Sequence, residues 1–310
     1  MNIKKIGLTA LAGSLVATTA AVSAELTING GASISVSNID KTQTGKDWSM
    51  GNNMYVTGSE ELDNGLVIST SFELDANSAQ TNNSPFDNHS VTVASESLGT
   101  LVFSGHGGSS AQSAIDTTAA GDIWNQTLGI TGPSAAAAGN DSMYYTLPTI
   151  VDDVTITASY SPGRAAQDSH TSWAIGYTGV EGLSLNFGQG DSGAPGSEIE
   201  STTMKGSYAI GSFTVGYSNT DNDKTGANNR EVTSYSVAYT VSDDLSINYG
   251  AETFDTTSES VDEEVETIGV SYTSGGVTLA ANSYAAEGVG NTAGASGEKE
   301  KWSLSATFAF

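Results

Sequence analysis

The stretch that decides the fold is ELTINGGASISVSN at residues 25–38, where apolar side chains recur at every second position. Leu26, Ile28, Ile34 and Val36 belong to this apolar series, and Thr, Asn and Ser stand between them. A period of two places the apolar side chains on one face of a β-strand and the polar side chains on the other. The stretch therefore predicts a strand with one apolar and one polar face.

The same alternation returns along the rest of the chain, and we count 16 candidate strands. The last one carries Trp302, Leu304, Ala306, Phe308 and Phe310 in a single phase. From the second strand onward, short and long connections alternate, as in a series of antiparallel hairpins. The short connections include residues 180–182, 242–244 and 274–276, and the long ones include residues 221–230, 255–264 and 288–299.

The composition of the two faces indicates which one points outward. No charged residue falls in the apolar phase of the strand cores, apart from Glu266 at the start of a strand. The opposite face consists of Ser, Thr, Asn and Gly with occasional charges, and such side chains do not fill a dry core. A β-sandwich buries its apolar face against a second sheet. A closed barrel with lipid outside and water inside needs the arrangement seen here, because closure leaves no unpaired strand edge in hydrocarbon. We therefore expect an all-β, 16-stranded antiparallel transmembrane β-barrel.

The overall composition excludes several classes of function. The 310 residues contain 10 basic and 35 acidic side chains, a formal net charge of −25, which argues against a nucleic-acid partner. The chain has no Cys, which excludes disulfides, Cys-ligated metals and thiol nucleophiles. Its Tyr, Trp and Phe residues are spread along the chain, and its low share of charged residues is not typical of disorder.

The first 24 residues have the pattern of a secretory signal peptide. Lys4 and Lys5 precede an apolar stretch at residues 6–22, and Val-Ser-Ala at residues 22–24 is a small-x-small cleavage pattern. The alternative is an N-terminal anchor helix, for which the stretch is short. We expect residues 25–310 to form the mature barrel, with eight of the ten basic residues.

Several motifs resemble the Gram-negative general porins, in an order that covers most of the mature chain. They are MYVTGSEELDNG at residues 54–65, NHSV at 88–91 followed by LGTL at 98–101, NDSMYYTLP at 140–148, and the terminal Phe310. The resemblance implies an outer-membrane homotrimer among lipids and lipopolysaccharide, in which each barrel has a long third loop folded into its lumen. It also implies that the last strand pairs with the first.

One connection has the length that such a loop requires. Residues 107–140 are far longer than a hairpin needs, and loops of this length in a compact fold are usually functional or disordered. We expect this connection to constrict the pore, with Asp116 and Asp122 facing the permeant stream. A solvated surface loop is the alternative.

The sequence departs from the resembled family on the wall opposite this loop. Family members place an arginine cluster there, whereas the corresponding positions here are Asn53, His89 and His106. Asn53 and His106 have the parity of the polar face. His89 shares the parity of the apolar Val91, so its transfer from the family is doubtful.

The charges of lumen-facing parity on the strands are Glu73, Asp75 and Glu252 against Lys205. Carboxylates lining a pore lower the energy of cations and raise that of anions. We therefore predict a channel for small hydrophilic solutes and ions that prefers cations. A substrate-selective channel, or a surface adhesin or receptor barrel, remains the alternative.

We expect no catalytic residue, cofactor or resident metal. GDSGAP at residues 190–195 mimics a serine-protease loop, but none of the three His has the sequence context of a catalytic base. The acidic segments at residues 221–226 and 259–266 leave Ca2+ binding open, although a solvated acidic loop explains both.

Overall fold

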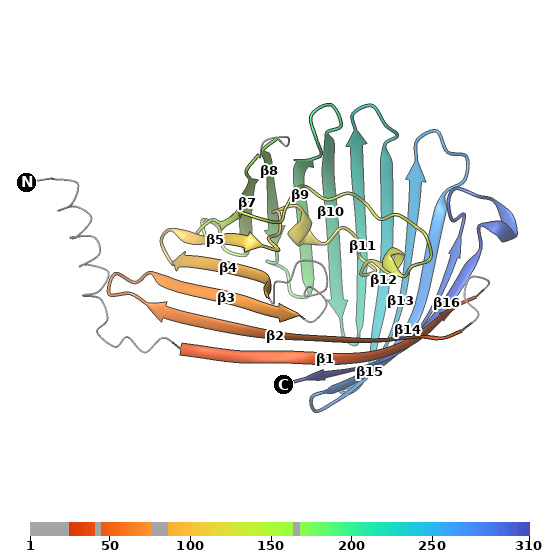
Figure 1. Ribbon diagram of the computed structural model, residues 1–310, viewed down its shortest axis with the longest axis horizontal. Coiled ribbons are helices and arrows are strands. Elements are labelled where there is room, and N and C mark those ends of the chain that lie inside the picture. Colours follow the sequence, from red (N-terminus) through yellow and green to blue (C-terminus); the bar gives the residue numbers. More distant parts are fainter. Residues whose placement is uncertain (1–24, 41–44, 76–85, 164–167) are drawn as a thin grey trace, which may run out of the picture.

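The strands form one closed antiparallel barrel, in which each strand pairs with its neighbours in sequence and β16 pairs with β1 (Figure 1). The structure is a computed structural model that describes residues 25–40, 45–75, 86–163 and 168–310. The predicted 16-stranded antiparallel barrel is confirmed, whereas the predicted signal peptide, residues 1–24, lies outside the described residues. The strands are β1 (Glu25–Ile39), β2 (Asp47–Glu61), β3 (Val67–Asp75), β4 (Phe86–Ser95), β5 (Gly99–His106), β6 (Ser142–Thr146), β7 (Val154–Ser161), β8 (His170–Tyr177), β9 (Leu183–Ser192), β10 (Ile199–Ile210), β11 (Phe213–Lys224), β12 (Arg230–Ser242), β13 (Leu245–Thr256), β14 (Glu263–Ser274), β15 (Val277–Glu287) and β16 (Lys299–Ala309).

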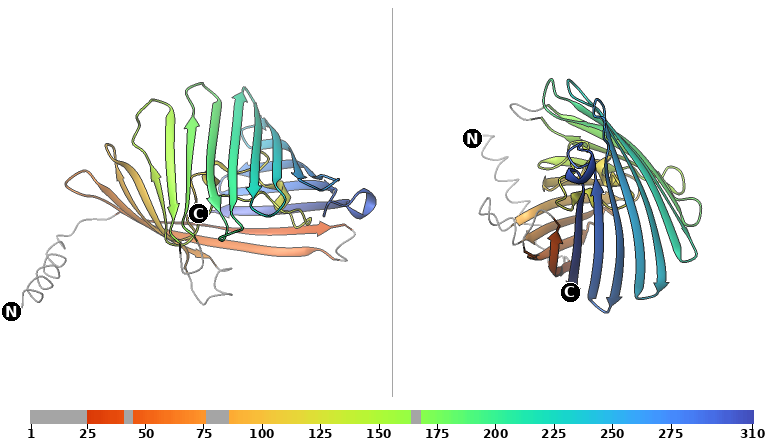
Figure 2. Two further views of the ribbon diagram at one scale, coloured as in Figure 1. Left: turned by 90° about the horizontal axis from the view of Figure 1, so that it is seen from above. Right: turned by 90° about the vertical axis from the view of Figure 1, so that its right-hand side faces the viewer.

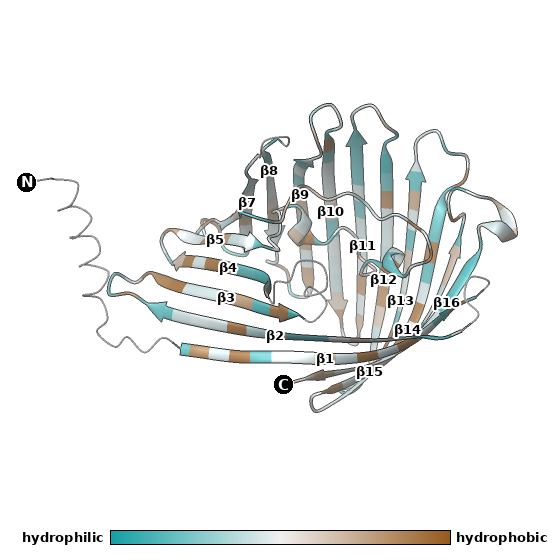
Figure 3. Cartoon of the chain, in the orientation of Figure 1, coloured by the Kyte–Doolittle hydropathy of each residue, from teal (hydrophilic) through white to brown (hydrophobic). Residues whose placement is uncertain are grey.

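The barrel has an apolar outer face and a polar inner face, the inverse of a water-soluble protein. Leu26, Trp173 and Leu304 keep 66%, 45% and 49% of their surface exposed, whereas Thr203 and Ser218 are fully buried. Figure 3 shows the resulting alternation of hydrophobic and hydrophilic residues along β1. Large apolar side chains outside and small polar ones inside suit a sheet between lipid and water.

The two ends of the chain close the barrel. Nine consecutive residues of β1 pair with β16, from Gly31 opposite Ala309 to Ile39 opposite Lys301. The backbone of Phe310 adds two further hydrogen bonds to Gly30, with N···O distances of 2.9 and 3.0 Å. Closure gives both terminal strands a pairing partner, as a sheet in hydrocarbon requires.

Several strands are longer than the sequence pattern predicts. Residues 221–230 were expected as a connection, but β11 and β12 continue through Asp221 paired with Glu231, which leaves only residues 225–229 between them. The same holds between β13 and β14, where Phe254 pairs with Glu263. Near these ends the outward positions become polar, as at Asp221 and Glu231, so the outward apolar series ends before the hydrogen-bond ladder does.

The strands run at an incline around the wall, as two further views show (Figure 2). Short helical turns lie in the longer connections: η1 (Ser113–Ile115) and η2 (Ile123–Asn125) between β5 and β6, and η3 (Gly294–Ser296) between β15 and β16. None of the helices in the described part of the chain is long and apolar enough to cross a membrane.

Candidate functional site: the barrel interior and the β5–β6 loop

The connection between β5 and β6, residues 107–141, crosses the polar face of the strands that follow it (Figure 1). We call it the β5–β6 loop, and the inner face of β7–β16 the loop-side wall. Gln112 donates from Nε2 to Thr203 Oγ1 at 2.7 Å, and the backbone N–H of Ala120 donates to Ser234 Oγ at 2.9 Å. Ser and Thr hydroxyls of the wall thus accept hydrogen bonds from both side-chain and backbone N–H groups of the loop.

The carboxylate of Glu252 accepts hydrogen bonds from two successive backbone N–H groups of the loop. The residue is 1% exposed, and its carboxylate accepts hydrogen bonds from the backbone N–H groups of Ile123 at 3.2 Å and Trp124 at 3.0 Å. A buried carboxylate needs such donors, because an unpaired buried charge is strongly unfavourable. Glu252 was predicted as a lumen-facing charge, and it lies on the inner wall beneath the loop, which separates it from the open lumen.

Asp116 and Asp122 both accept hydrogen bonds from side chains of the loop or of the wall next to it. Asp116 accepts from Lys205 Nζ at 2.7 Å, and the same ammonium also donates to the carbonyl oxygen of Thr118 at 2.9 Å. Asp122 accepts from Thr118 Oγ1 at 2.9 Å and from Trp124 Nε1 at 3.1 Å. Both aspartates have a positive φ, 67° and 55°, which short polar side chains tolerate better than most. Their hydrogen bonds shape the loop, and the charge of Asp116 is matched by Lys205.

Three more cations of the loop-side wall reach the loop. Lys301 Nζ donates to Gln126 O at 3.0 Å, Lys299 Nζ to Leu128 O at 2.6 Å, and Arg230 Nη2 to Thr131 O at 2.6 Å. Arg230 also forms an ion pair with Glu263 at 2.8 Å, in which both side chains are almost fully buried. Its guanidinium lies 4.9 Å from the centre of the Phe254 ring.

A small dry cluster lies between the loop and the wall, which the sequence reading did not foresee. The residues of this cluster are buried and apolar, and they come from the loop (Ile123, Leu128, Ile130), from β1 (Ile39), from strands β12–β15 (Val232, Phe254, Val265, Tyr284, Ala286) and from the connection between β15 and β16 (Val289). Each fully buried side chain of this size contributes about 1.5–3 kcal/mol relative to an exposed one. The sequence signal for this cluster was an apolar residue at a position where the alternation calls for a polar one, namely Val232 in β12, Phe254 in β13 and Val265 in β14.

Glycines of the loop-side wall make room for the loop. A Cβ added at Gly190 would lie 2.6 Å from Ala136 Cβ, and one added at Gly250 would lie 2.8 Å from Ala120 Cβ. At Gly188 an added Cβ would lie 2.6 Å from Ile115 Cδ1. The absence of side chains at these positions lets the loop approach the sheet closely.

The inner face of β2–β5, which we call the open wall, has different chemistry. Glu73 is 7% exposed and accepts from Tyr55 Oη at 2.6 Å, Asn88 Nδ2 at 2.5 Å and Asn53 Nδ2 at 3.3 Å. All three donors are neutral. The described strands β2–β5 contain no Lys or Arg, so the negative charge of Glu73 has no strand cation beside it.

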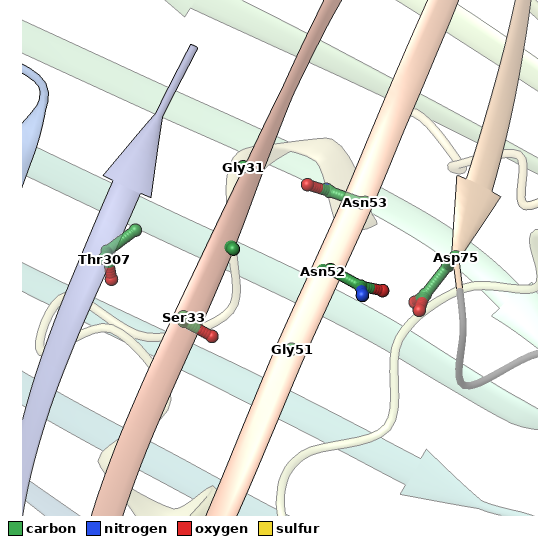
Figure 4. A pocket seen from close by; sticks show the side chains of 8 residues that line it. Gly31, Ser33, Gly51, Asn52, Asn53, Asp75 and Thr307 are labelled. Carbon is green, nitrogen blue, oxygen red and sulfur yellow. The ribbon is translucent and has the colours of Figure 1, made fainter.

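A hollow of about 240 Å3 lies beside this cluster, between β16, β1, β2 and β3 (Figure 4). Gly31 and Gly51 supply no side chains to fill it, and Asn53 and the half-buried Asp75 lie at its edge. Asn53 and Asp75 are paired across β2 and β3. Two predicted lumen residues thus meet at one place on the open wall.

A β-bulge interrupts the alternation of inward and outward side chains along β5 just before His106. The pairing changes from Ser90 opposite Ser104 to His89 opposite His106, with Gly105 as the extra residue. Alternation along β5 therefore does not carry through to His106, whose Nδ1 lies 3.9 Å from Asp87 Oδ1. His89 pairs with the outward-facing Phe72, in agreement with its doubtful assignment to the lumen.

A family model described as Gram-negative porin matches residues 7–310. The chain belongs to the Gram-negative porin family. Membership of this family places this porin in the outer membrane. No curated protein matches the sequence.

Solved structures share the fold of this porin at low sequence identity. A loop-deletion variant of OmpT, an outer membrane protein of Vibrio cholerae, matches with a TM-score of 0.71 at 15% identity over 93% of this chain and 99% of that chain. A porin refined at 1.8 Å resolution matches with a TM-score of 0.69 at 17% identity, over 92% and 100%. The trimer form of Vibrio cholerae OmpT matches with a TM-score of 0.65 at 13% identity, over 93% and 99%.

Among the described residues of this porin, no group of three or more His, Asp or Glu side chains is arranged to hold a metal ion. Sequence reasoning missed several residues that shape the interior. Tyr55 and Asn88 were not identified as partners of Glu73, nor were Gln112, Arg230, Lys299 and Lys301 as contacts of the loop. Their partners are 15 to 175 residues away in sequence, and a hydrogen-bond partner at such separation leaves no local pattern.

Proposed function

We propose that this porin is a water-filled channel for the passive diffusion of small hydrophilic solutes and ions, and that it passes cations in preference to anions. The channel operates without a catalytic step or cofactor. Pore width and the charges on the lumen wall decide which solutes pass.

The distribution of charge between the two walls is the observation that carries the preference. Lys205, Arg230, Lys299 and Lys301 all donate to carbonyl oxygens of the β5–β6 loop, so their charges lie behind or beside the loop backbone. On the open wall the charge of Glu73 is held by neutral donors. Carboxylates on a pore wall favour cations, and the effect fades as salt shortens the Debye length.

The proposal includes a homotrimer in contact with outer-membrane lipids and lipopolysaccharide. A trimer form is described for a structural neighbour, OmpT of Vibrio cholerae. The apolar outer face of the barrel suits both lipid and a second subunit, so the outer face alone does not distinguish them.

The reversal potential across a planar bilayer tests the ion preference. With purified protein in a tenfold KCl gradient, we expect stepwise conductance increments and a reversal potential displaced toward the potassium equilibrium potential. A reversal potential at zero or displaced toward chloride would contradict the cation preference. Absence of conductance steps would instead favour an adhesin or receptor barrel.

A further inference from the structure

Half of the basic residues expected in the mature chain bind the backbone of one loop. The sequence after residue 24 contains eight Lys and Arg side chains. Four of them donate to carbonyl oxygens of the β5–β6 loop: Lys205 to Thr118, Lys301 to Gln126, Lys299 to Leu128 and Arg230 to Thr131. We propose that these four cations are positioning residues that hold the loop against the wall and thereby set the width of the channel. The inference rests on the proposed channel function.

The choice of carbonyl oxygens as partners follows from the local backbone. Residues 116–131 form no ladder with a neighbouring strand and contain only the one-turn helix η2, so most of their carbonyl oxygens lack partners within the loop. An ammonium or guanidinium group forms a stronger hydrogen bond with such an oxygen than a neutral donor does. The four donor–acceptor distances lie between 2.6 and 3.0 Å.

Side chains of the wall bind both the N–H groups and the carbonyl oxygens of the loop backbone. Upstream, the carboxylate of Glu252 accepts N–H groups at Ile123 and Trp124. Downstream, cations take the carbonyl oxygens of residues 126, 128 and 131. Acceptor and donor side chains in this order fix the loop at several points along its length, which favours one position over a range of positions.

The surroundings of the two lysines of β16 add a steric component. A Cβ added at Gly129 would lie 2.9 Å from Lys299 Nζ and 3.3 Å from Val289 Cγ1. Leu128, whose carbonyl oxygen binds Lys299, is itself fully buried in the apolar cluster. The backbone at residues 128–129 is therefore seated by an apolar side chain and by an ammonium group together.

This role differs from that of cations that face the solute. The charges of Lys299 and Lys301 are directed to backbone oxygens, so we expect their loss to change loop position more than ion selectivity. A cation lining the permeant path would show the opposite pattern. The two roles are separable by measuring conductance and reversal potential on the same variant.

The test is the double variant Lys299→Met/Lys301→Met of the full-length protein, recorded in planar bilayers. We expect a broad distribution of conductance levels with open-channel noise at least severalfold above that of the wild type, because the released loop moves within the lumen. Lys224→Met is the matched control, since it removes a cation near the same barrel end whose ammonium makes no contact with the loop in the described structure. Lys299→Arg/Lys301→Arg keeps the donors and should restore a narrow distribution.

A second measurement reports loop position directly. The chain has no Cys, so Leu128→Cys introduces a single thiol at a fully buried loop position. In the presence of Lys299→Met/Lys301→Met, we expect its reaction with a water-soluble maleimide to accelerate at least tenfold, toward the rate of Thr127→Cys at an exposed neighbour.

Unchanged conductance, noise and labelling would overturn the inference. A single narrow conductance level with a reversal-potential change larger than that of Lys224→Met would also overturn it, because the lysines would then act as charges in the stream. Failure of the wild type to conduct at all would refute the channel function itself, and the labelling comparison would still decide whether the cations hold the loop.

Discussion

Each wall of the barrel carries a buried glutamate held by neutral donors, Glu73 on the open wall and Glu252 on the loop-side wall, and the two carboxylates are used differently. On the open wall, Glu73 is held by side chains of β2 and β4, the strands on either side of its own. On the loop-side wall, Glu252 of β13 is held by backbone N–H groups almost 130 residues earlier in the chain. The first arrangement keeps a charge on the wall of the lumen, whereas the second uses a charge to fix a loop. The same residue type thus fixes a loop on one wall, and on the other wall it carries the charge to which we attribute the proposed ion preference.

Among the variants that test the difference between the two walls, replacement of Glu252 by Leu should have the largest effect, a loss of stability of the β5–β6 loop. The variant leaves two backbone N–H groups without an acceptor, each at a cost of about 1–3 kcal/mol. We expect amide hydrogen exchange in residues 118–131 to accelerate by about 30-fold or more. Glu73→Gln is the control and should leave exchange in this segment unchanged, and a similar response to both variants would contradict the division between the walls.

An intermediate effect is expected from a glycine on the loop-side wall. In Gly250→Ala the new Cβ would lie 2.8 Å from Ala120 Cβ and 3.2 Å from Thr267 Cγ2, so the loop must shift, and overpacking of this kind costs roughly 1–3 kcal/mol. The matched variant on the open wall is Gly51→Ala, where the added Cβ meets only Ser33 Oγ at 2.9 Å. Single-channel recordings should show altered conductance for Gly250→Ala alone. Equal responses would mean that the loop does not depend on this contact.

The smallest effect is expected from Glu73→Gln on ion selectivity. A unit charge about 8 Å from an ion in water changes its energy by roughly 0.5 kcal/mol, about a twofold factor. The reversal potential at low salt should therefore move toward zero, and the difference from the wild type should shrink in 1 M salt. Glu252→Gln should move the reversal potential less, because the loop covers that carboxylate. The reverse order would show that Glu252 contributes more to the permeant path.

Hydrophobic alternation predicted the number and order of strands because lipid contact demands an apolar residue at every second position. The prediction was wrong at the strand ends around residues 221–230, where outward positions such as Asp221 and Glu231 are polar and the apolar series no longer marks the strands. Alternation also does not fix the direction of His106, since the bulge at Gly105 shifts the pairing by one residue. Strand pairing depends on backbone hydrogen bonds, which any side chain except Pro permits.

For the candidate lumen residues, the sequence predicted the side of the sheet but not the hydrogen-bond partners. Parity along β2 and β3 was enough to group Asn53, Glu73 and Asp75 on one wall, because adjacent antiparallel strands keep their faces in register. Parity also put Lys205 and Glu252 inside the barrel. It gave no information on their partners, and Asp116 and Asp122 turned out to hydrogen-bond to residues around the loop.

The sequence by itself determined that this chain is a two-faced closed barrel with a polar interior, an excess of acidic residues and one long connection. Those properties follow from periodicity and composition, which act locally or on the chain as a whole. Only the tertiary structure decided which charges face the lumen and which are occupied by the loop. That outcome depends on contacts between segments as many as 175 residues apart, such as Lys301 with Gln126, and such contacts exist only once the barrel has closed.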